Sequence, residues 1–194
     1  MILIQKMFCS FFLIVLSPIM LLLWIVIKAT SQGPALYCSK RLGRDKKNIL
    51  VRKFRTMYSS VPYNICRKLK ESPEWTEGQK LHADIRVTSV GRWLRRFSLD
   101  EIPQIWNILD GDMNWIGPRP IVPEEESKYG RYSEEIHTVK PGITGLWQVS
   151  GRNELPYHRR IAINLYYVRH QSWRLDLWIV CKTVVAIIGG RGAY

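Results

Sequence analysis

The feature that most constrains the fold is an uncharged apolar run of 21 residues, Met7 to Ile27, near the start of the chain. A helix rises about 1.5 Å per residue, so a run of this length just crosses a hydrocarbon core of about 30 Å. A cleaved signal peptide is disfavoured, because the run is longer than a usual signal and a single lysine precedes it. We therefore expect a membrane-associated protein.

Ser17 and Pro18 interrupt the middle of this run. Proline removes a backbone donor and clashes with the preceding turn, so a bend is expected, and Ser17 can satisfy a freed backbone group. Halves of roughly ten residues each reach only about mid-bilayer. Lys6 and Lys28 flank both ends, so charge does not decide the orientation. The residues leave two alternatives open: a re-entrant helix with both ends on one face, and a kinked span.

Composition narrows the class of partner and of site. The 194 residues suffice for one domain with a core, and the net charge of +13 points to a polyanion: nucleic acid, an anionic membrane surface or phosphate-bearing substrates. The cysteines form no close pair and the histidines show no ligand spacing, which argues against a disulfide framework and a transition-metal site. The cysteines are Cys9, Cys38, Cys66 and Cys181.

Beyond residue 30 the sequence predicts a mainly helical α+β fold. Strand-like runs at Leu36–Ser39 and Ile49–Phe54 flank a charged turn and predict a small β-hairpin. Apolar spacing predicts helices at Tyr157–Gln171 and Leu175–Ile188, the second in the core or at a membrane interface. Val90–Phe97 predicts an interfacial amphipathic helix with basic side chains toward lipid phosphates.

An acid pair, Asp100 and Glu101, follows that helix directly. Ser98 and Glu101 have capping-box spacing, or Asp100 is itself the cap, so the pair is expected at a helix N-terminus. The helix macrodipole stabilises acids there by about 0.3 to 1 kcal/mol, so the position of the pair can be explained without a functional role. Arg95 and Arg96 lie close by, however, and helix N-termini also bind phosphate. A carboxylate there can attack phosphorus or hold Mg²⁺.

Arginines in glycine- and proline-rich loops form a second group of candidates. Arg119 in GPRP and Arg152 in SGRN suit bidentate recognition of a phosphate or a nucleobase edge. Surface charge in a basic protein is the simpler explanation for each, and equally for Lys53 in RKFRT. Asp176 is interpreted as a helix cap or as the partner of an arginine.

The segments SLDEIPQIWNILDGDMNWIGPRP and VKPGITGLWQVSGRNE together resemble the bacterial sugar transferase family, the monotopic polyprenyl-phosphate phosphoglycosyl transferases. The resemblance extends from the Ser-Pro pair through RKFRTM to the terminal GRGAY. It implies transfer of a sugar 1-phosphate from a UDP-sugar to undecaprenyl phosphate, with release of UMP. The GLWQVSGRNE loop and the GAY terminus look most like members that use glucose or galactose.

The resemblance also implies roles for individual residues. Asp100 matches the nucleophile that forms a covalent phosphosugar adduct, and Glu101 beside it matches the Mg²⁺-associated carboxylate. Asp176 matches a further acidic position, and Ser17-Pro18 matches the break of a re-entrant helix. The residues that match positions binding phosphate or uridine are Lys53, Arg95, Arg119 and Arg152.

The expected organisation is a re-entrant membrane helix, residues 1–30, and a cytosolic catalytic domain, residues 31–194, at the bacterial inner membrane. Larger members carry spanning helices before the catalytic region, so this chain resembles a minimal form. Membrane lipids are expected partners, a homodimer is possible in principle, and nucleic acid is not expected. Two positions depart from the family pattern, Cys9 and Asn164, where aspartate is frequent. The rival hypothesis is a membrane-tethered basic protein that binds anionic lipid or nucleic acid, which leaves the acid pair without a purpose.

Overall fold

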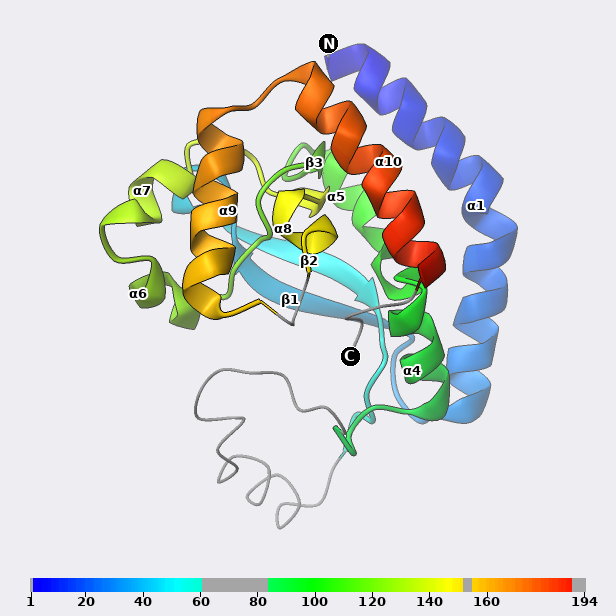
Figure 1. Cartoon of the computed structure of the whole chain (residues 1–194). Coiled ribbons are helices and arrows are strands. Elements are labelled where there is room, and N and C mark those ends of the chain that lie inside the picture. The colour runs from blue at the N-terminus through cyan, green and yellow to red at the C-terminus, as the bar shows by residue number, and fades with distance from the viewer. Residues whose placement is uncertain (1, 61–83, 152–154, 190–194) are drawn as a thin grey trace.

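The fold begins with one long helix, α1 (Ile2–Thr30), which contains Pro18. The computed structural model describes residues 2–60, 84–151 and 155–189. The helix continues through Pro18 without interruption and curves along one side of the molecule (Figure 1). The Ser17 hydroxyl donates to the carbonyl of Ile14 at 2.7 Å, in the turn before the proline. The expected break is therefore a curve in a continuous helix, and a re-entrant course remains a prediction.

Gln5–Thr30 is long and apolar enough to cross a membrane. Most of this segment is exposed, but Cys9, Leu23 and Ile27 are buried against the remainder of the chain. One face of the helix therefore packs into the core of the protein. The opposite face carries exposed apolar side chains.

The predicted β-hairpin is confirmed. Strands β1 (Leu36–Leu42) and β2 (Asn48–Phe54) pair antiparallel, with Leu36 opposite Phe54 and Leu42 opposite Asn48. The short helix η1 (Arg44–Lys46) forms the turn. Since side chains alternate along a strand, every second residue of each strand points to the same face.

The first helix after residue 84 is α4 (Ser89–Arg96). The Thr88 hydroxyl oxygen caps its N-terminus by accepting from the Gly91 N–H at 2.8 Å. Next come η2 (Leu99–Gln104) and α5 (Ile105–Asp110). Leu94 of α4 is fully buried, whereas Trp93 is half exposed. The amphipathic character predicted for this helix is therefore confirmed.

Two core clusters join α1 to the hairpin and to these helices. One combines Cys9 of α1 with Val51 of β2 and Ile105 of α5, and the other combines Ile27 of α1 with Phe54 of β2 and Leu94 of α4. The hairpin, the segment from α4 to α5, and α1 are therefore packed as successive layers (Figure 1).

Buried Asn107 links α5 to β2 by hydrogen bonds. Its Oδ1 accepts from the Arg52 N–H at 3.0 Å, and its Nδ2 donates to the Leu50 carbonyl at 2.7 Å. A buried polar side chain is stable only when it is hydrogen-bonded, and here both of its groups are.

Arg55 joins the end of α1 to the end of β2. This buried guanidinium donates to the Ser31 carbonyl at 2.8 Å and also to the Gln32 carbonyl, both just beyond α1. The first turn after the membrane-type helix is thus fixed to the hairpin by charge-assisted hydrogen bonds.

The remaining elements follow α5 in the sequence. A short parallel pair joins β3 (Asn114–Ile116) and β4 (Gly142–Thr144). The helices of this part are η3 (Pro123–Glu125), α6 (Glu126–Tyr129), η4 (Gly130–Tyr132), α7 (Ser133–Ile136), α8 (Leu146–Val149), α9 (Tyr157–Arg169) and α10 (Trp173–Gly189). The two long C-terminal helices and the mainly helical α+β class agree with the predictions.

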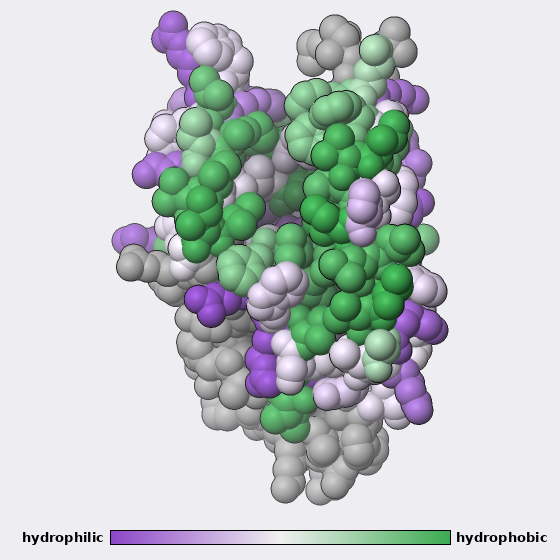
Figure 2. All heavy atoms as spheres, turned by 90° about the vertical axis from the view of Figure 1, so that its right-hand side faces the viewer, coloured by the Kyte–Doolittle hydropathy of each residue, from purple (hydrophilic) through white to green (hydrophobic). Residues whose placement is uncertain are grey.

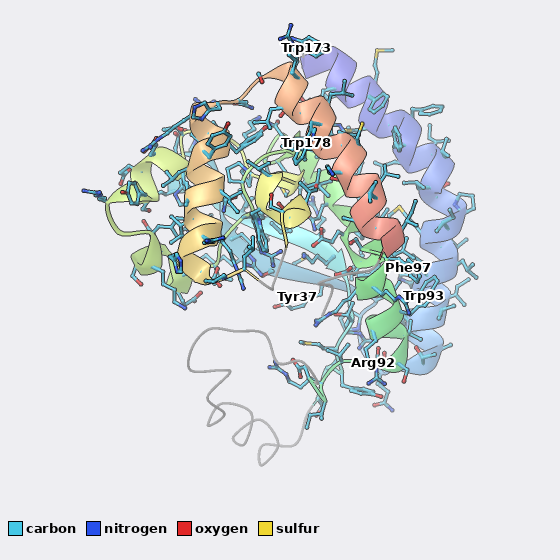
Figure 3. All side chains as sticks on the ribbon, in the orientation of Figure 1. Tyr37, Arg92, Trp93, Phe97, Trp173 and Trp178 are labelled. Atoms are coloured by element: carbon cyan, nitrogen blue, oxygen red, sulfur yellow. The ribbon has the colours of Figure 1, made fainter. Side chains whose placement is uncertain are left out.

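Helix α10 exposes most of its apolar side chains. Trp173 and Trp178 (Figure 3) are exposed. Ile188 is exposed as well, whereas Ile179 is buried. Figure 2 shows hydrophobic side chains of α1 and α10 on one face of the molecule, as two ridges with a furrow between them. Of the two environments expected for this helix, an interface fits better than the core.

Candidate active site

A cavity of about 860 Å³ lies against one face of the hairpin and is closed by parts of α4, η2, α8 and α10. Basic side chains outnumber acidic ones in its lining, which makes it a positively charged space suited to phosphate-bearing ligands. The basic residues are Arg41, Lys53, Arg55, Arg86, Arg95 and Arg119. The acidic residues are Asp84, Asp100 and Glu101.

The acid pair lies in the first turn of η2, as expected for acids at a helix N-terminus. The capping-box prediction is wrong, however, because Ser98 has a left-handed backbone (φ 56°) and its side chain makes no capping hydrogen bond. The Glu101 N–H instead donates to the Ser98 carbonyl at 3.2 Å. This turn places Asp100 and Glu101 against the hairpin, with Asp100 only 9% exposed.

Lys53 of β2 reaches Glu101 directly, with Nζ 2.7 Å from Oε1. The lysine and glutamate side chains are 20% and 25% exposed, so this ion pair is less screened by solvent than a surface pair. It fixes the position of Glu101 from the opposite wall of the cavity.

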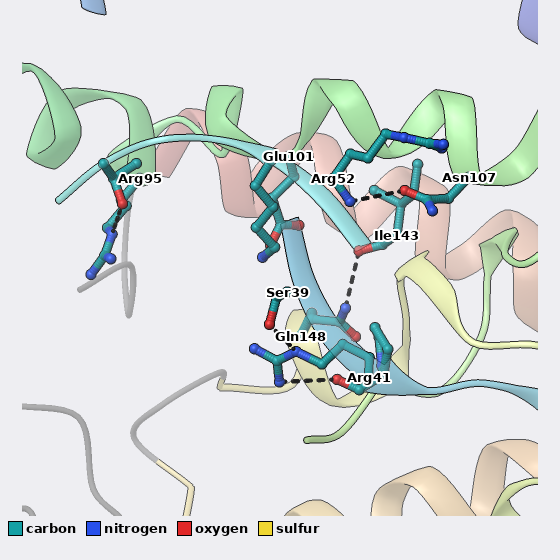
Figure 4. Close-up of polar contacts among 11 residues, drawn as sticks. Ser39, Arg41, Arg52, Arg95, Glu101, Asn107, Ile143 and Gln148 are labelled. Atoms are coloured by element: carbon teal, nitrogen blue, oxygen red, sulfur yellow. Dashed lines mark hydrogen bonds and ion pairs between the residues drawn. The ribbon is translucent and has the colours of Figure 1, made fainter. Parts of the chain in front are cut away.

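Arg95 comes from α4 and points into the cavity rather than toward lipid, contrary to our expectation for the basic side chains of this helix. Its Nε–H donates to the Thr56 hydroxyl at 2.9 Å (Figure 4). Burial lowers the pKa of Arg95, and the nearby charges of Asp100 and Asp84 oppose that shift. A cation thus stands beside Asp100 within the same cavity.

Arg119 enters the cavity from the GPRP loop, and its guanidinium lies over the Trp147 ring, 5.5 Å from the centroid. The loop is held by close backbone packing, because a Cβ on Gly142 or Gly145 would overlap the backbone of Gly117. The glycines noted in the sequence therefore bring the GPRP loop and the loop before α8 together.

The cavity lining also includes apolar side chains. They come from η2, α5, β3, β4 and α10, and they adjoin the exposed apolar surface of α10. The residues are Ile102, Ile105, Trp115, Ile143 and Ile187. One cavity thus combines a region that suits phosphates with a region that suits hydrocarbon.

Three positions singled out in the sequence lie elsewhere. Asp176 accepts a hydrogen bond from the Tyr167 hydroxyl at 2.8 Å and does not line the cavity. Asn164 is buried in α9, and Cys9 is buried in the core against α5. Arg152 lies outside the described residues.

The acid pair is suitable for Mg²⁺. Within residues 2–60, 84–151 and 155–189 no group of three or more His, Cys, Asp or Glu side chains could hold a metal ion. Mg²⁺ commonly uses only one or two carboxylates, and its other ligands are waters and substrate phosphates. Two neighbouring carboxylates that line a cavity of this size fit that requirement.

Sequence reasoning missed Arg41, which lies in the cavity close to Arg119. Strand alternation could have found it. Tyr37, Ser39 and Arg41 are spaced by two along β1, and the register pairs Tyr37 with Lys53, so all four share the cavity face.

Comparison with known proteins identifies relatives along nearly the whole chain. Residues 2–190 match the family model described as bacterial sugar transferase. The exopolysaccharide production protein ExoY of Sinorhizobium fredii is 41% identical over 186 residues, which are 94% of this chain and 82% of that protein. The undecaprenyl-phosphate galactose phosphotransferase of Salmonella typhimurium is 40% identical over 94% of this chain and 39% of its own length.

A third relative is the UDP-glucose:undecaprenyl-phosphate glucose-1-phosphate transferase of Klebsiella pneumoniae, 39% identical over 95% of this chain and 39% of its own length. The chain therefore spans most of ExoY but only about two-fifths of the two transferases.

Proposed function

The chain belongs to the bacterial sugar transferase family, and on that premise we propose that it transfers a sugar 1-phosphate from a UDP-sugar to undecaprenyl phosphate. The observation that carries the proposal is the position of Asp100. This carboxylate is nearly buried in a basic cavity, with the charge of Arg95 nearby and the Lys53–Glu101 ion pair at the next residue.

In the first step an oxygen of Asp100 attacks the β-phosphorus of the UDP-sugar. The bond from that phosphorus to the bridging oxygen breaks, and UMP leaves with the bonding electron pair. The sugar phosphate is then esterified to Asp100 as a mixed anhydride. Arg95 and Arg119 offset negative charge that would otherwise repel the carboxylate from the diphosphate.

In the second step an oxygen of the polyprenyl phosphate attacks the same phosphorus. The Asp100 carboxylate leaves, and the product is a polyprenyl diphosphate sugar. This two-step exchange means that the water-soluble donor and the lipid acceptor need not be bound at once.

Glu101 and Asp100 are the residues that would hold Mg²⁺, which when bound neutralises diphosphate charge. Lys53 keeps the Glu101 carboxylate on the cavity wall at 2.7 Å. The chain itself thus fixes the orientation of one carboxylate before any substrate arrives.

A lipid acceptor is supported by the apolar region of the cavity and by the apolar surfaces of α1 and α10 (Figure 2). We place α1 in the bacterial inner membrane as a re-entrant helix, with the catalytic residues on the cytoplasmic face. The curvature of α1, a helix that contains Pro18, is compatible with that course. The sugar is glucose or galactose, because relatives named for each are similar over most of this chain.

The second candidate, a tethered protein that binds anionic lipid, accounts for the net charge of +13 and for α1. It gives no role to the acid pair inside the cavity. One experiment separates the two. Purified protein is mixed with Mg²⁺ and with UDP-glucose or UDP-galactose, without a lipid acceptor.

The enzyme is expected to release UMP in a burst of at most one equivalent and to retain a phosphosugar on the protein. A binding protein releases none. Absence of a burst with every UDP-sugar tested would rule out the two-step mechanism.

A further inference from the structure

Two arginines face the cavity without an ion-pair partner among the described residues. Arg41 donates from Nε to the Ser39 hydroxyl at 3.0 Å and from a terminal nitrogen to the Pro120 carbonyl at 3.4 Å (Figure 4). Arg119 has the Trp147 ring beneath its guanidinium. No carboxylate within residues 2–60, 84–151 and 155–189 forms an ion pair with either one.

The two cations repel each other. Burial, followed by the charge of Arg119, lowers the pKa of Arg41 to about 10, while Glu125 and Glu101 act in the opposite direction. Each guanidinium keeps donors that are free for a ligand, since it carries five N–H groups. A bound anion between the two would offset the repulsion, so Arg41 and Arg119 together suit an anionic ligand.

A neighbouring side chain has an acceptor atom without a partner among the described residues. Gln148 lines the same cavity and donates from Nε2 to the Ile143 carbonyl at 3.1 Å (Figure 4). Its Oε1 is shielded from solvent and accepts no hydrogen bond from any described residue. A ligand that brings both an anion and an N–H or O–H donor would satisfy all three side chains.

The open acceptor of Gln148 indicates which substrate supplies the anion. A nucleoside carries N–H and O–H donors, whereas a prenyl chain carries none, so the UDP-sugar fits better than the lipid phosphate. Arg95 contacts Thr56, just beyond the Phe54 end of the hairpin, and Arg41 lies beside Leu42 at the other end. The cavity therefore offers two separate groups of cations, one for each phosphate of the reaction.

We propose that Arg41 and Arg119 bind the phosphate that remains with the nucleoside when the donor diphosphate is cleaved, so that this pair holds the leaving nucleoside monophosphate. The inference rests on the proposed function and assigns a role to Arg41, which no sequence motif had singled out. The imide N–H of a uracil base is a donor that could bond to the Gln148 Oε1, which accepts from no described residue.

The test measures UMP affinity by calorimetry on the full chain in detergent. Arg41→Gln removes the charge, Arg41→Lys keeps it without the planar guanidinium, and Lys40→Gln is the matched control. Lys40 is exposed and adjacent on β1, and it points away from the cavity face. We expect the Kd for UMP to rise at least about tenfold in Arg41→Gln and less in Arg41→Lys. It should stay within about twofold of wild type in Lys40→Gln.

A folding defect is separated by circular dichroism and thermal unfolding, in which Arg41→Gln should keep the wild-type spectrum and a cooperative transition. An unchanged Kd in Arg41→Gln, or an equal rise in Lys40→Gln, overturns the inference. A wild-type protein that shows the burst but binds no UMP also overturns it and leaves the proposed function intact. A wild-type protein with no burst overturns the proposed function itself.

Discussion

Lys53 and Glu101 form an ion pair across the cavity, with 2.7 Å between Nζ and Oε1, which joins strand β2 to the turn that carries Asp100. The two residues are 48 positions apart in the sequence, so this contact ties the hairpin to the acid pair. Because both side chains are mostly buried, neither can be removed without leaving the other charge poorly compensated.

Replacing Lys53 with methionine is therefore expected to impair catalysis. Glu101 loses its fixed partner and Asp100 loses a neighbouring cation, so we expect kcat/KM for UMP release to fall by about a hundredfold. Arg52→Gln is the control, because Arg52 immediately precedes Lys53 and forms an ion pair of its own, with exposed Asp110 at 2.6 Å. Equal rates for the two variants would show that the ion pair has no catalytic part.

Asp100→Asn is expected to abolish the protein-bound phosphosugar. An amide is a poor nucleophile toward phosphorus, whereas the shape of the side chain is nearly unchanged. Intact-protein mass spectrometry after incubation with UDP-sugar should show the adduct on wild type and on Asp110→Asn, an exposed carboxylate outside the cavity. An adduct on the Asp100→Asn protein would end the assignment of the nucleophile.

Removal of divalent cations is expected to stop UMP release without unfolding the protein. Two carboxylates bind Mg²⁺ largely together with the substrate, so the free protein needs no metal to fold. EDTA should eliminate the burst, excess Mg²⁺ should restore it, and the melting temperature should shift by less than about 2 °C. A burst that survives EDTA treatment argues against a metal at the acid pair.

Asn107→Ala is expected to destabilise the fold. The substitution leaves the Arg52 N–H and the Leu50 carbonyl without their partner in a buried place, which costs about 2 to 5 kcal/mol. Thermal unfolding followed by circular dichroism measures the loss. Asn48→Ala is the control, because Asn48 is exposed on β2, the strand that Asn107 contacts, and its replacement should change the stability little.

Pro18→Ala is expected to change how α1 lies in the membrane. A continuous helix without proline favours a straight span, so an N-terminal tag should move partly to the face opposite the catalytic residues. Protease access to the tag in oriented vesicles reports this. Leu21→Ala, an exposed position in the same helix, should leave the tag where it is in wild type. A tag opposite the catalytic residues in wild type would replace the re-entrant course with a span.

The elements that local patterns control could be predicted from the sequence. The hairpin, the amphipathic α4 and the two C-terminal helices follow from the spacing of apolar residues and from turn residues between them. The location of the acid pair in a first helical turn also follows, because acids there are favoured by the macrodipole.

What depended on tertiary structure could not be predicted. Ser98 was expected to cap a helix, but its left-handed backbone instead sets the turn between α4 and η2. The amphipathic pattern of α4 predicted that Arg95 faces lipid, whereas the family resemblance predicted a phosphate-binding position. In the structure Thr56 and the charge of Asp100 hold Arg95 inside the cavity. Arg41 and Arg119 are 78 positions apart (119 − 41), and only the folded chain places them together.

Arg55 couples the orientation of α1 to the hairpin that lines the cavity. Its guanidinium donates hydrogen bonds to the carbonyls of Ser31 and Gln32 and so joins them to the end of β2. A tilt of α1 is therefore transmitted to the hairpin. Bilayers of different thickness tilt such helices to different degrees. We therefore expect turnover to vary with the acyl-chain length of the surrounding lipids, even when their head groups are the same.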